Sequence, residues 1–293
     1  MTRRIAFINE KGGSGKTTLV ANLASHLAME RGRRTLAIDM DPQGQLGKVL
    51  GLDVRKPRGS SIELLVDSLL GDASRPDVPE TGALRRTLPI QHTRIPRLDV
   101  IVANKALALA PGLGDATQET GERAPERRLA RNLDLSREAH QYDFVLFDAP
   151  PSFGALTLSV LLACEEVVVP VPLTYLAIDG FAELLRTMSM VRTRYGHRTL
   201  RVSMVVPTFY RRTRMAHEIL EKLSTRFPKE IAQTIVGFHV KIDEAQSHGL
   251  SIFEYAPRDR GAVVMAALAE ELESRDPRAN TDPNADLDSG DPT

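Results

Sequence analysis

The stretch that decides the fold is Glu10-Lys11-Gly12-Gly13-Ser14-Gly15-Lys16-Thr17-Thr18. Before it stands the short apolar run Ile5-Ala6-Phe7-Ile8, which is typical of a buried parallel strand. After it, residues 19–28 carry apolar side chains at helical spacing. A strand, a glycine-rich turn and a helix in this order form the context in which a Gly-Lys-Thr pattern binds phosphate. The sequence therefore predicts a phosphate loop at the start of an α/β fold.

The residue types of this loop suit a nucleoside triphosphate with magnesium. Its three glycines let successive backbone N–H groups turn toward one ligand, and the following helix adds the positive end of its dipole. Lys16 supplies a positive charge for the β- and γ-phosphates, and the Thr17 hydroxyl suits Mg²⁺. A glycine-rich turn that binds nothing is the weaker alternative, because Gly-Lys-Thr here lies between a strand and a helix.

One position departs from the common phosphate-loop pattern, which would have glycine where this chain has Glu10, followed by Lys11. A lysine five residues before Lys16 does not easily reach the same phosphate within one protomer, so it fits better as a contact to nucleotide held by a second copy. The run K-G-G-x-G-K-T-T resembles the deviant Walker A motif of the ParA/MinD family of dimerising ATPases. The resemblance implies that Lys11 acts in trans in a nucleotide-sandwich dimer. The residues that it implies for ATP binding are Lys11, Gly12, Gly13, Ser14, Gly15, Lys16, Thr17 and Thr18.

Two aspartates, Asp39 and Asp41, follow the next apolar strand over residues 35–38. Acidic residues at the carboxyl end of a strand in an open parallel sheet sit where such folds bind ligands. A helix cap and a turn aspartate are the alternative. The stretch D-x-D-P-Q-G resembles the family's second motif, which implies that Asp41 positions or activates the attacking water. By the same resemblance Asp39 belongs to the outer shell around Mg²⁺.

A third acid, Asp148, ends the apolar strand that starts at Tyr142, and Ala149-Pro150-Pro151 follows it. A carboxylate at the end of a buried strand beside a phosphate loop can hold Mg²⁺ through water. The D-x-P-P pattern resembles the family's third motif, and its proline turn resembles a γ-phosphate-sensing switch. The predicted catalytic set is Lys11, Lys16 and Asp41. The predicted metal set is Thr17, Asp39 and Asp148.

The sequence indicates the binding site for the nucleotide base less clearly than the phosphate loop. A strand is predicted over residues 200–206, with the stretch from Pro207 to Tyr210 ending it. In the family that the chain resembles, this turn lies near the base, which makes Thr208 and Phe209 candidates for adenine contact; a structural role fits them equally well. Val236-Gly237-Phe238-His239 stands where relatives usually show Ile-Pro-Arg-Asn, so base selectivity is less secure than phosphate binding.

Four basic residues are candidates for DNA contact. Arg211, Arg212 and Arg214 open a predicted helix, where the positive end of the dipole disfavours cations, so an anion is expected nearby. Lys241 stands where ParA-type relatives carry a DNA-contacting arginine. Surface cations without a partner are the alternative.

The composition bounds the class of protein. The chain has 293 residues, of which 42% are hydrophobic and 26% charged, and equal numbers of basic and acidic residues, 38 each, so a nucleic-acid surface would have to be a local patch. The single cysteine, Cys164, excludes a disulfide framework and a cysteine-built metal cluster within one chain. We expect no signal peptide and no membrane span, hence a cytoplasmic, nucleoid-associated protein.

We expect one ATPase domain over residues 1–273, a mostly parallel twisted sheet with helices on both faces, and a disordered acidic tail over 274–293. Further strands are expected over 98–102 and 165–172, and further helices over 61–70, 126–133, 178–194 and 261–272. Residues 53–100 are otherwise interpreted as a surface excursion, and 103–140 as helix interrupted between Pro111 and Pro125.

The family resemblance covers residues 3 to about 272, including the signature Ser247 to Pro257. It implies a Mg²⁺-dependent ATPase that dimerises on ATP, binds double-stranded DNA without sequence preference and is stimulated by a ParB-like centromere-binding protein. Such a protein partitions a chromosome or plasmid. A MinD-like positioning ATPase is the first alternative, disfavoured because the chain ends in an acidic, proline-broken stretch rather than a basic amphipathic helix, so no membrane partner is expected. Further alternatives are an amidotransferase-type ligase, a nitrogenase-reductase-like electron donor and a tyrosine kinase. The single cysteine disfavours the electron donor. The chain lacks the carboxy-terminal tyrosine cluster expected of the kinase.

Overall fold

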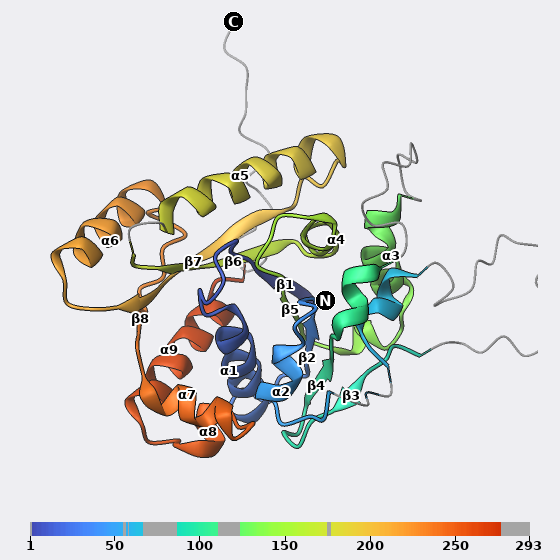
Figure 1. Cartoon of the computed structure of the whole chain (residues 1–293), viewed down its shortest axis with the longest axis horizontal. Coiled ribbons are helices and arrows are strands. Elements are labelled where there is room, and N and C mark those ends of the chain that lie inside the picture. The colour runs from blue at the N-terminus through green and yellow to red at the C-terminus, as the bar shows by residue number, and fades with distance from the viewer. Residues whose placement is uncertain are drawn as a thin grey trace, which may run out of the picture.

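A single eight-stranded sheet forms the middle layer of the protein in the computed structural model, which describes residues 2–54, 57, 59–66, 87–110, 124–174 and 177–276 (Figure 1). The strand order is β3-β4-β2-β5-β1-β6-β7-β8, and every pairing is parallel except the antiparallel pair β3–β4. The predicted mostly parallel sheet is therefore confirmed. The strands are β1 (Arg3–Phe7), β2 (Thr35–Asp39), β3 (Gln91–His92), β4 (Leu98–Ile101), β5 (Phe144–Asp148), β6 (Glu166–Pro172), β7 (Arg201–Tyr210) and β8 (Val236–Gly237).

Helices cover both faces of this sheet (Figure 1). The α-helices are α1 (Lys16–Met29), α2 (Gln45–Val49), α3 (Arg128–Leu135), α4 (Ala155–Ala163), α5 (Ala177–Arg194), α6 (Arg214–Arg226), α7 (Val240–Ser247), α8 (Ile252–Tyr255) and α9 (Arg260–Ser274). Short 3-10 turns are η1 (Ser61–Leu65), η2 (Lys105–Leu109), η3 (Pro125–Arg127) and η4 (Ala139–Gln141). Helices α1, α2, α7, α8 and α9 pack on one face, and α3 to α6 pack on the other.

The central strands are apolar on both sides because each face of the sheet has its own core. In β1, Ile5 and Phe7 pack under the α1 layer, whereas Ala6 points to the α4 layer. In β5, Leu146 packs under the α1 layer and Phe147 packs under the α4 layer. Successive side chains of a strand point to opposite faces, so a strand that is covered on both must be apolar throughout. This is why the short runs are recognisable in the sequence.

The register of the strands brings the predicted acids together. Asp148, the last residue of β5, is paired with Phe7 of β1 on one side and with Asp39 of β2 on the other. The phosphate loop leaves the sheet immediately after β1. Because these strands are parallel, their carboxyl ends share one edge, which is where open α/β sheets bind ligands.

Three element boundaries differ from the expectation. The predicted helix over 61–70 is only the 3-10 turn η1, with residues 67–70 outside the described chain. Strand β7 continues through Pro207 to Tyr210 because it pairs with β6 and, at its end, with β8. Helix α6 begins at Arg214 rather than at Arg211, because the Thr213 side chain accepts a hydrogen bond from the Ala216 N–H and caps it.

The expected helix over 103–140 is likewise divided into short elements. Within the described residues it consists of η2, η3, α3 and η4, and residues 111–123 lie outside them. The predicted boundary of the acidic tail falls on the last residue of α9, Ser274. The Arg275 guanidinium donates to the carbonyls of Glu230 and Ile231, which holds this end of α9 against the loop after α6. Residues 277–293, most of the expected tail, lie outside the described chain. None of the described helices combines the length and apolar character needed to cross a bilayer.

A buried ion pair ties the first strand to the last helix. The Arg3 guanidinium donates to both carboxylate oxygens of Glu166, at 3.0 and 2.9 Å, and to the carbonyl of Leu272 in α9. Only 3% of either charged side chain is exposed. Removing one partner of such a pair leaves an uncompensated buried charge.

We expect Glu166→Ala to lower the free energy of unfolding by about 3–5 kcal/mol, because Arg3 then lacks its counter-charge. Urea unfolding followed by circular dichroism measures the loss. Glu183→Ala is the matched control, since Glu183 pairs with Arg186 on the surface of α5 and such pairs contribute under about 1 kcal/mol. Equal losses in the two variants would contradict this account of the Arg3–Glu166 pair.

Candidate functional site

The phosphate loop has a backbone that requires its glycines. Gly13 and Gly15 have φ of 69° and 98°, in the left-handed region that favours glycine, and Gly15 directly precedes α1. A Cβ placed on Gly12 or Gly13 would meet no atom within 4 Å. Open space therefore lies beside the loop at these two glycines. The Ser14 hydroxyl oxygen is buried beside it without a hydrogen-bond partner.

Lys16 is folded inward over this loop. Its ammonium donates to the carbonyl of Asn9 at 2.9 Å and to that of Lys11 at 3.4 Å. Burial lowers the pKa of Lys16, while the charges of Asp148 and Asp41 act to raise it. A buried ammonium held only by neutral carbonyls is well placed to exchange them for phosphate oxygens, which form stronger, charge-assisted hydrogen bonds.

Asp148 and Thr17 form the metal half of the predicted site. The Thr17 hydroxyl donates to Asp148 Oδ2 at 2.6 Å, and Asp148 Oδ1 is buried with no partner. Burial raises the pKa of Asp148 to about 7, although the Thr17 hydrogen bond and the Lys16 charge act to lower it. A divalent cation would compensate this buried carboxylate, so the residues present fit Mg²⁺.

No group of three or more His, Cys, Asp or Glu side chains in the described parts of the chain is arranged to hold a metal.

Asp39 fixes the loop that carries Asp41. Asp39 is fully buried, and its two oxygens accept the N–H groups of Asp41 and Leu46, both at 3.0 Å. Burial raises the pKa of Asp39 well above its ordinary value, and the charge of Asp148 adds to the effect. The Asp39 oxygens thus cap backbone N–H groups, which is the alternative role considered from the sequence. A role of Asp39 around Mg²⁺ stays a prediction. Asp41 is half-buried and close enough for its charge to act on Lys16 and Asp148.

Lys11 lies outside the cradle of its own protomer. Its ammonium donates to Thr174 Oγ1 at 2.9 Å, in an exposed position after β6. The loop is anchored at this end by Asn9, whose side chain accepts the Lys11 N–H and donates to the Pro170 carbonyl. Asn9 is not among the residues that the sequence singles out, although a polar residue directly after a buried strand is the available signal. The trans role of Lys11 stays a prediction.

A small cavity of about 60 Å³ lies beside the phosphate loop. The predicted base contacts are there: Thr208 donates its hydroxyl proton to the Ser14 carbonyl at 3.1 Å, and the Phe209 ring comes within 3.8 Å of a Cβ built on Gly15. Phe209 has a positive φ of 53°, which is unusual for a bulky residue and directs its ring to this place. The structure therefore brings both residues to the loop, and their contact with adenine stays a prediction.

The cavity is also lined by residues that the sequence does not predict as site residues, among them Phe238, His239 and Asp243. Phe238 is 52% exposed, an unusual position for a phenylalanine. The available sequence signal is that Val236-Gly237-Phe238-His239 differs from the Ile-Pro-Arg-Asn usual in relatives. That difference does not show that the Phe238 side chain lines a cavity.

The four candidate DNA contacts come from two segments of the chain, the start of α6 with the loop before it and helix α7. Arg211 and Arg212 lie exposed between β7 and α6, while Lys241 lies on α7 in the layer on the other face of the sheet (Figure 1). Arg214 pairs with Glu218 at 2.8 Å. Lys241 pairs with Glu244 at 2.6 Å and lies 5.8 Å from the centre of the Tyr255 ring. DNA contact by these four residues stays a prediction.

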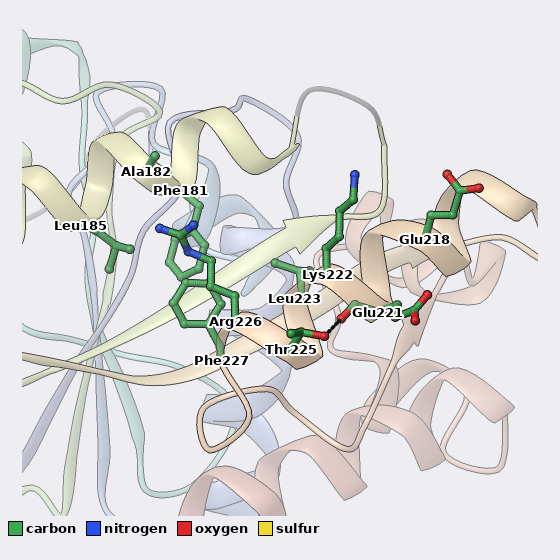
Figure 2. Close-up of a pocket in the computed structure, with 10 residues that line it drawn as sticks. All are labelled: Phe181, Ala182, Leu185, Glu218, Glu221, Lys222, Leu223, Thr225, Arg226 and Phe227. Atoms are coloured by element: carbon green, nitrogen blue, oxygen red, sulfur yellow. Dashed lines mark hydrogen bonds between the residues drawn. The ribbon is translucent and has the colours of Figure 1, made fainter.

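A separate cavity lies between two helices of the other layer. It is a groove of about 630 Å³ between α5 and α6, and Phe181, Leu185, Leu223 and Phe227 supply its apolar floor (Figure 2). Charged side chains of α6, among them Glu218 and Arg226, stand around it. No residue of the phosphate loop and none of the three aspartates contributes to its lining, so it is separate from the site.

Comparison with known proteins agrees with this geometry. The family described as AAA domain matches residues 2–202. The sporulation initiation inhibitor protein Soj of Bacillus subtilis is 33% identical over 272 residues, which cover 93% of this chain and 98% of that protein. The chromosome-partitioning ATPase Soj of Treponema pallidum is 34% identical, with 94% and 99% covered.

Among solved structures, one described as cobyrinic acid a,c-diamide synthase from Mycobacterium smegmatis, with bound ADP and magnesium, is 30% identical with a TM-score of 0.70. The match covers 93% of this chain and 94% of that one. The extent of the matches to the curated relatives, nearly end to end at about a third identity, decides the family. The chain belongs to the ParA/Soj family of chromosome-partitioning ATPases.

Proposed function

We propose that this protein is a Mg²⁺-dependent ATPase of one domain, residues 1–273, that dimerises on ATP and then binds double-stranded DNA without sequence preference. It would partition a chromosome or plasmid together with a ParB-like protein, in the cytoplasm and on the nucleoid. The observation that supports ATP hydrolysis best is the set of buried polar groups around open space: Lys16 on neutral carbonyls, and Asp148 with one unpartnered oxygen. A related structure holds ADP and magnesium.

The chemistry follows from how these residues are placed. Lys16 leaves the carbonyls of Asn9 and Lys11 and offsets charge on the β/γ-bridging and γ oxygens. Thr17 and Asp148 would hold Mg²⁺, which would supply positive charge to offset the charge that develops on the phosphates. Asp41 accepts a hydrogen bond from the attacking water and orients it. Asp39 keeps Asp41 in place through the hydrogen bonds that fix residues 41 to 46.

Dimerisation is proposed to place Lys11 on the nucleotide of a second copy. Among the described residues of one protomer, the hydrogen-bond partner of this exposed ammonium is the neutral Thr174 hydroxyl. Exchanging that partner for a phosphate oxygen gives a charge-assisted hydrogen bond. The gain on binding triphosphate would therefore draw two chains together.

An amide-forming ligase is the second candidate, because the related Mycobacterium smegmatis structure is described as a diamide synthase. A glutamine-dependent amidation requires a nucleophile such as a reactive thiolate in the same protein or in a partner. The one cysteine of this chain, Cys164, is fully buried, and burial raises the pKa of its thiol well above the ordinary value. Within this chain the partition function therefore has the better support.

DNA binding can be tested on the Lys241–Glu244 pair. The Glu244 carboxylate compensates the Lys241 ammonium at 2.6 Å, so Glu244→Gln should strengthen duplex binding about threefold, whereas Lys241→Glu should weaken it about tenfold or more. Arg211→Ala and Arg212→Ala should weaken it in the same direction. Fluorescence anisotropy with ATP, Mg²⁺ and two unrelated duplexes over a salt series measures these effects.

The variant Lys105→Glu is the control for the change in net charge. Lys105 is an exposed residue of η2, which follows β4. If it weakens binding as much as Lys241→Glu does, the proposed patch is wrong. Sedimentation with anionic liposomes and ATP separates this function from a MinD-like one, and we expect the protein to stay in the supernatant.

A further inference from the structure

One side chain of α7 reaches into the phosphate loop. Gln246 Nε2 donates a hydrogen bond of 2.7 Å to the hydroxyl oxygen of Thr18. Thr18 lies in the first turn of α1 and lines the cavity beside the loop together with Gly15. The two residues are 228 positions apart in sequence, so the contact exists only because α7 packs on this layer of the fold.

The direction of this hydrogen bond fixes what the Thr18 hydroxyl can do. A hydroxyl has one proton and two lone pairs, so a donor on one lone pair leaves its proton free for another acceptor. The other hydrogen bond of Thr18, besides those of the helix, uses its backbone carbonyl, which accepts from Asn22. In the described part of the chain, no hydrogen bond takes the hydroxyl proton. That proton is therefore available to a ligand in the cradle.

We propose that Gln246 is a positioning residue that holds the Thr18 hydroxyl as a hydrogen-bond donor to a phosphate oxygen of the bound nucleotide. The inference rests on the proposed ATP binding. A neutral amide suits this place because its N–H donates to the hydroxyl, whereas a carboxylate would accept the hydroxyl proton and repel phosphate. Holding a donor in the right orientation before the ligand arrives raises affinity by lowering the ordering cost.

A second polar contact keeps α7 and α8 seated on α1. The side-chain oxygen of Asn22, one turn after Thr18, accepts the N–H of Ile252 at 2.9 Å. Gln246 is thus carried by a segment that is fixed at two points on the phosphate-loop helix. Because coupling free energies are reciprocal, a nucleotide that uses the Thr18 proton also stabilises the position of α7, the helix that bears Lys241.

The test is a double-mutant cycle on the full chain with Thr18→Val and Gln246→Met, which both keep side-chain size. ATP affinity is measured by fluorescence with a labelled analogue and Mg²⁺. We expect Gln246→Met alone to weaken binding about fivefold, the scale of one hydrogen bond. In the Thr18→Val background the same change should alter affinity less than about 1.5-fold, because no hydroxyl remains to be positioned.

The variant Gln246→Glu tests whether the direction of the hydrogen bond to Thr18 matters for ATP affinity. A carboxylate only accepts, so it would take the Thr18 proton away from the nucleotide, and affinity should fall more than with Gln246→Met. Gln246→Glu in the Thr18→Val background measures the effect of the added charge alone, and we expect a smaller loss there. Thermal unfolding midpoints of all variants check that the fold is kept.

Two results overturn the inference: unchanged ATP affinity in Gln246→Met, or an equal loss with and without the Thr18 hydroxyl, which would indicate a structural role only. If the unaltered protein does not bind ATP at all, the proposed function fails first.

Discussion

Replacing Lys16 by alanine is expected to reduce ATP affinity by more than about 100-fold, which corresponds to about 2.7 kcal/mol. Lys16 is the one lysine whose ammonium lies buried within the phosphate loop, on the carbonyls of Asn9 and Lys11. The variant removes the charge that offsets the β- and γ-phosphates, and no other cation of the loop points into the same space within one protomer. Isothermal titration with ATP and Mg²⁺ measures the change.

Lys105→Ala serves as the control for loss of a surface lysine, and its ATP affinity should equal that of the unaltered protein. The Lys16→Ala chain should retain its circular dichroism spectrum, because the side chain makes hydrogen bonds only to carbonyls of its own loop. ATP binding of ordinary strength in Lys16→Ala would show that the nucleotide, if there is one, lies elsewhere.

Replacing Asp41 by alanine is expected to separate binding from turnover. Asp41 is half-buried at the start of the segment that Asp39 fixes, and its side chain accepts the Gln43 N–H. The variant should bind ATP about as well as the unaltered protein but hydrolyse it at least about 100-fold more slowly, because the attacking water loses its orienting carboxylate. Phosphate release and retention of labelled ATP on one sample measure both quantities.

Glu183→Ala, which removes an exposed carboxylate of α5, should leave the hydrolysis rate unchanged. Asp41→Asn keeps the size of the side chain and should behave like Asp41→Ala if the charge is what matters. Ordinary turnover in both Asp41 variants would refute the role assigned to this residue.

The sequence predicts the elements that position the phosphate loop because local pattern and burial agree there. Strands β1, β2 and β5 are covered on both faces, so their apolar runs are continuous. Strands β2 and β5 each end in an aspartate at the same edge of the sheet. Gly13 and Gly15 have a positive φ that favours glycine, and glycines in this spacing are visible in the sequence. This part of the candidate site can therefore be predicted from the amino-acid sequence alone.

The remainder depends on contacts between distant parts of the chain. Strand β7 extends to Tyr210 because β8 pairs with its end, and no local pattern shows that pairing. Helix α6 begins at Arg214 because Thr213 caps it, which removes Arg211 and Arg212 from the helix start, where their charge would be unfavourable. Asp39 uses its oxygens on residues that follow it by two and seven positions, a cap that competes with the predicted metal role.

The cavity beside the loop and the Gln246–Thr18 contact are out of reach of sequence patterns for the same reason. Both are made where α7 and the segment before it return to α1 after more than 200 residues of chain. Hydrophobic periodicity identifies helices, but it does not say which polar side chain of one helix will meet which hydroxyl of another.

The proposal that a triphosphate in the phosphate loop joins two chains is tested most directly by light scattering on the Asp41→Ala variant with Mg²⁺ and either ATP or ADP. The account predicts twice the mass of one chain with ATP and the mass of one chain with ADP. It also predicts that adding Lys11→Ala abolishes the ATP-dependent doubling while ATP stays bound. A single-chain mass with ATP demonstrably bound would contradict the proposed dimer and the role of Lys11.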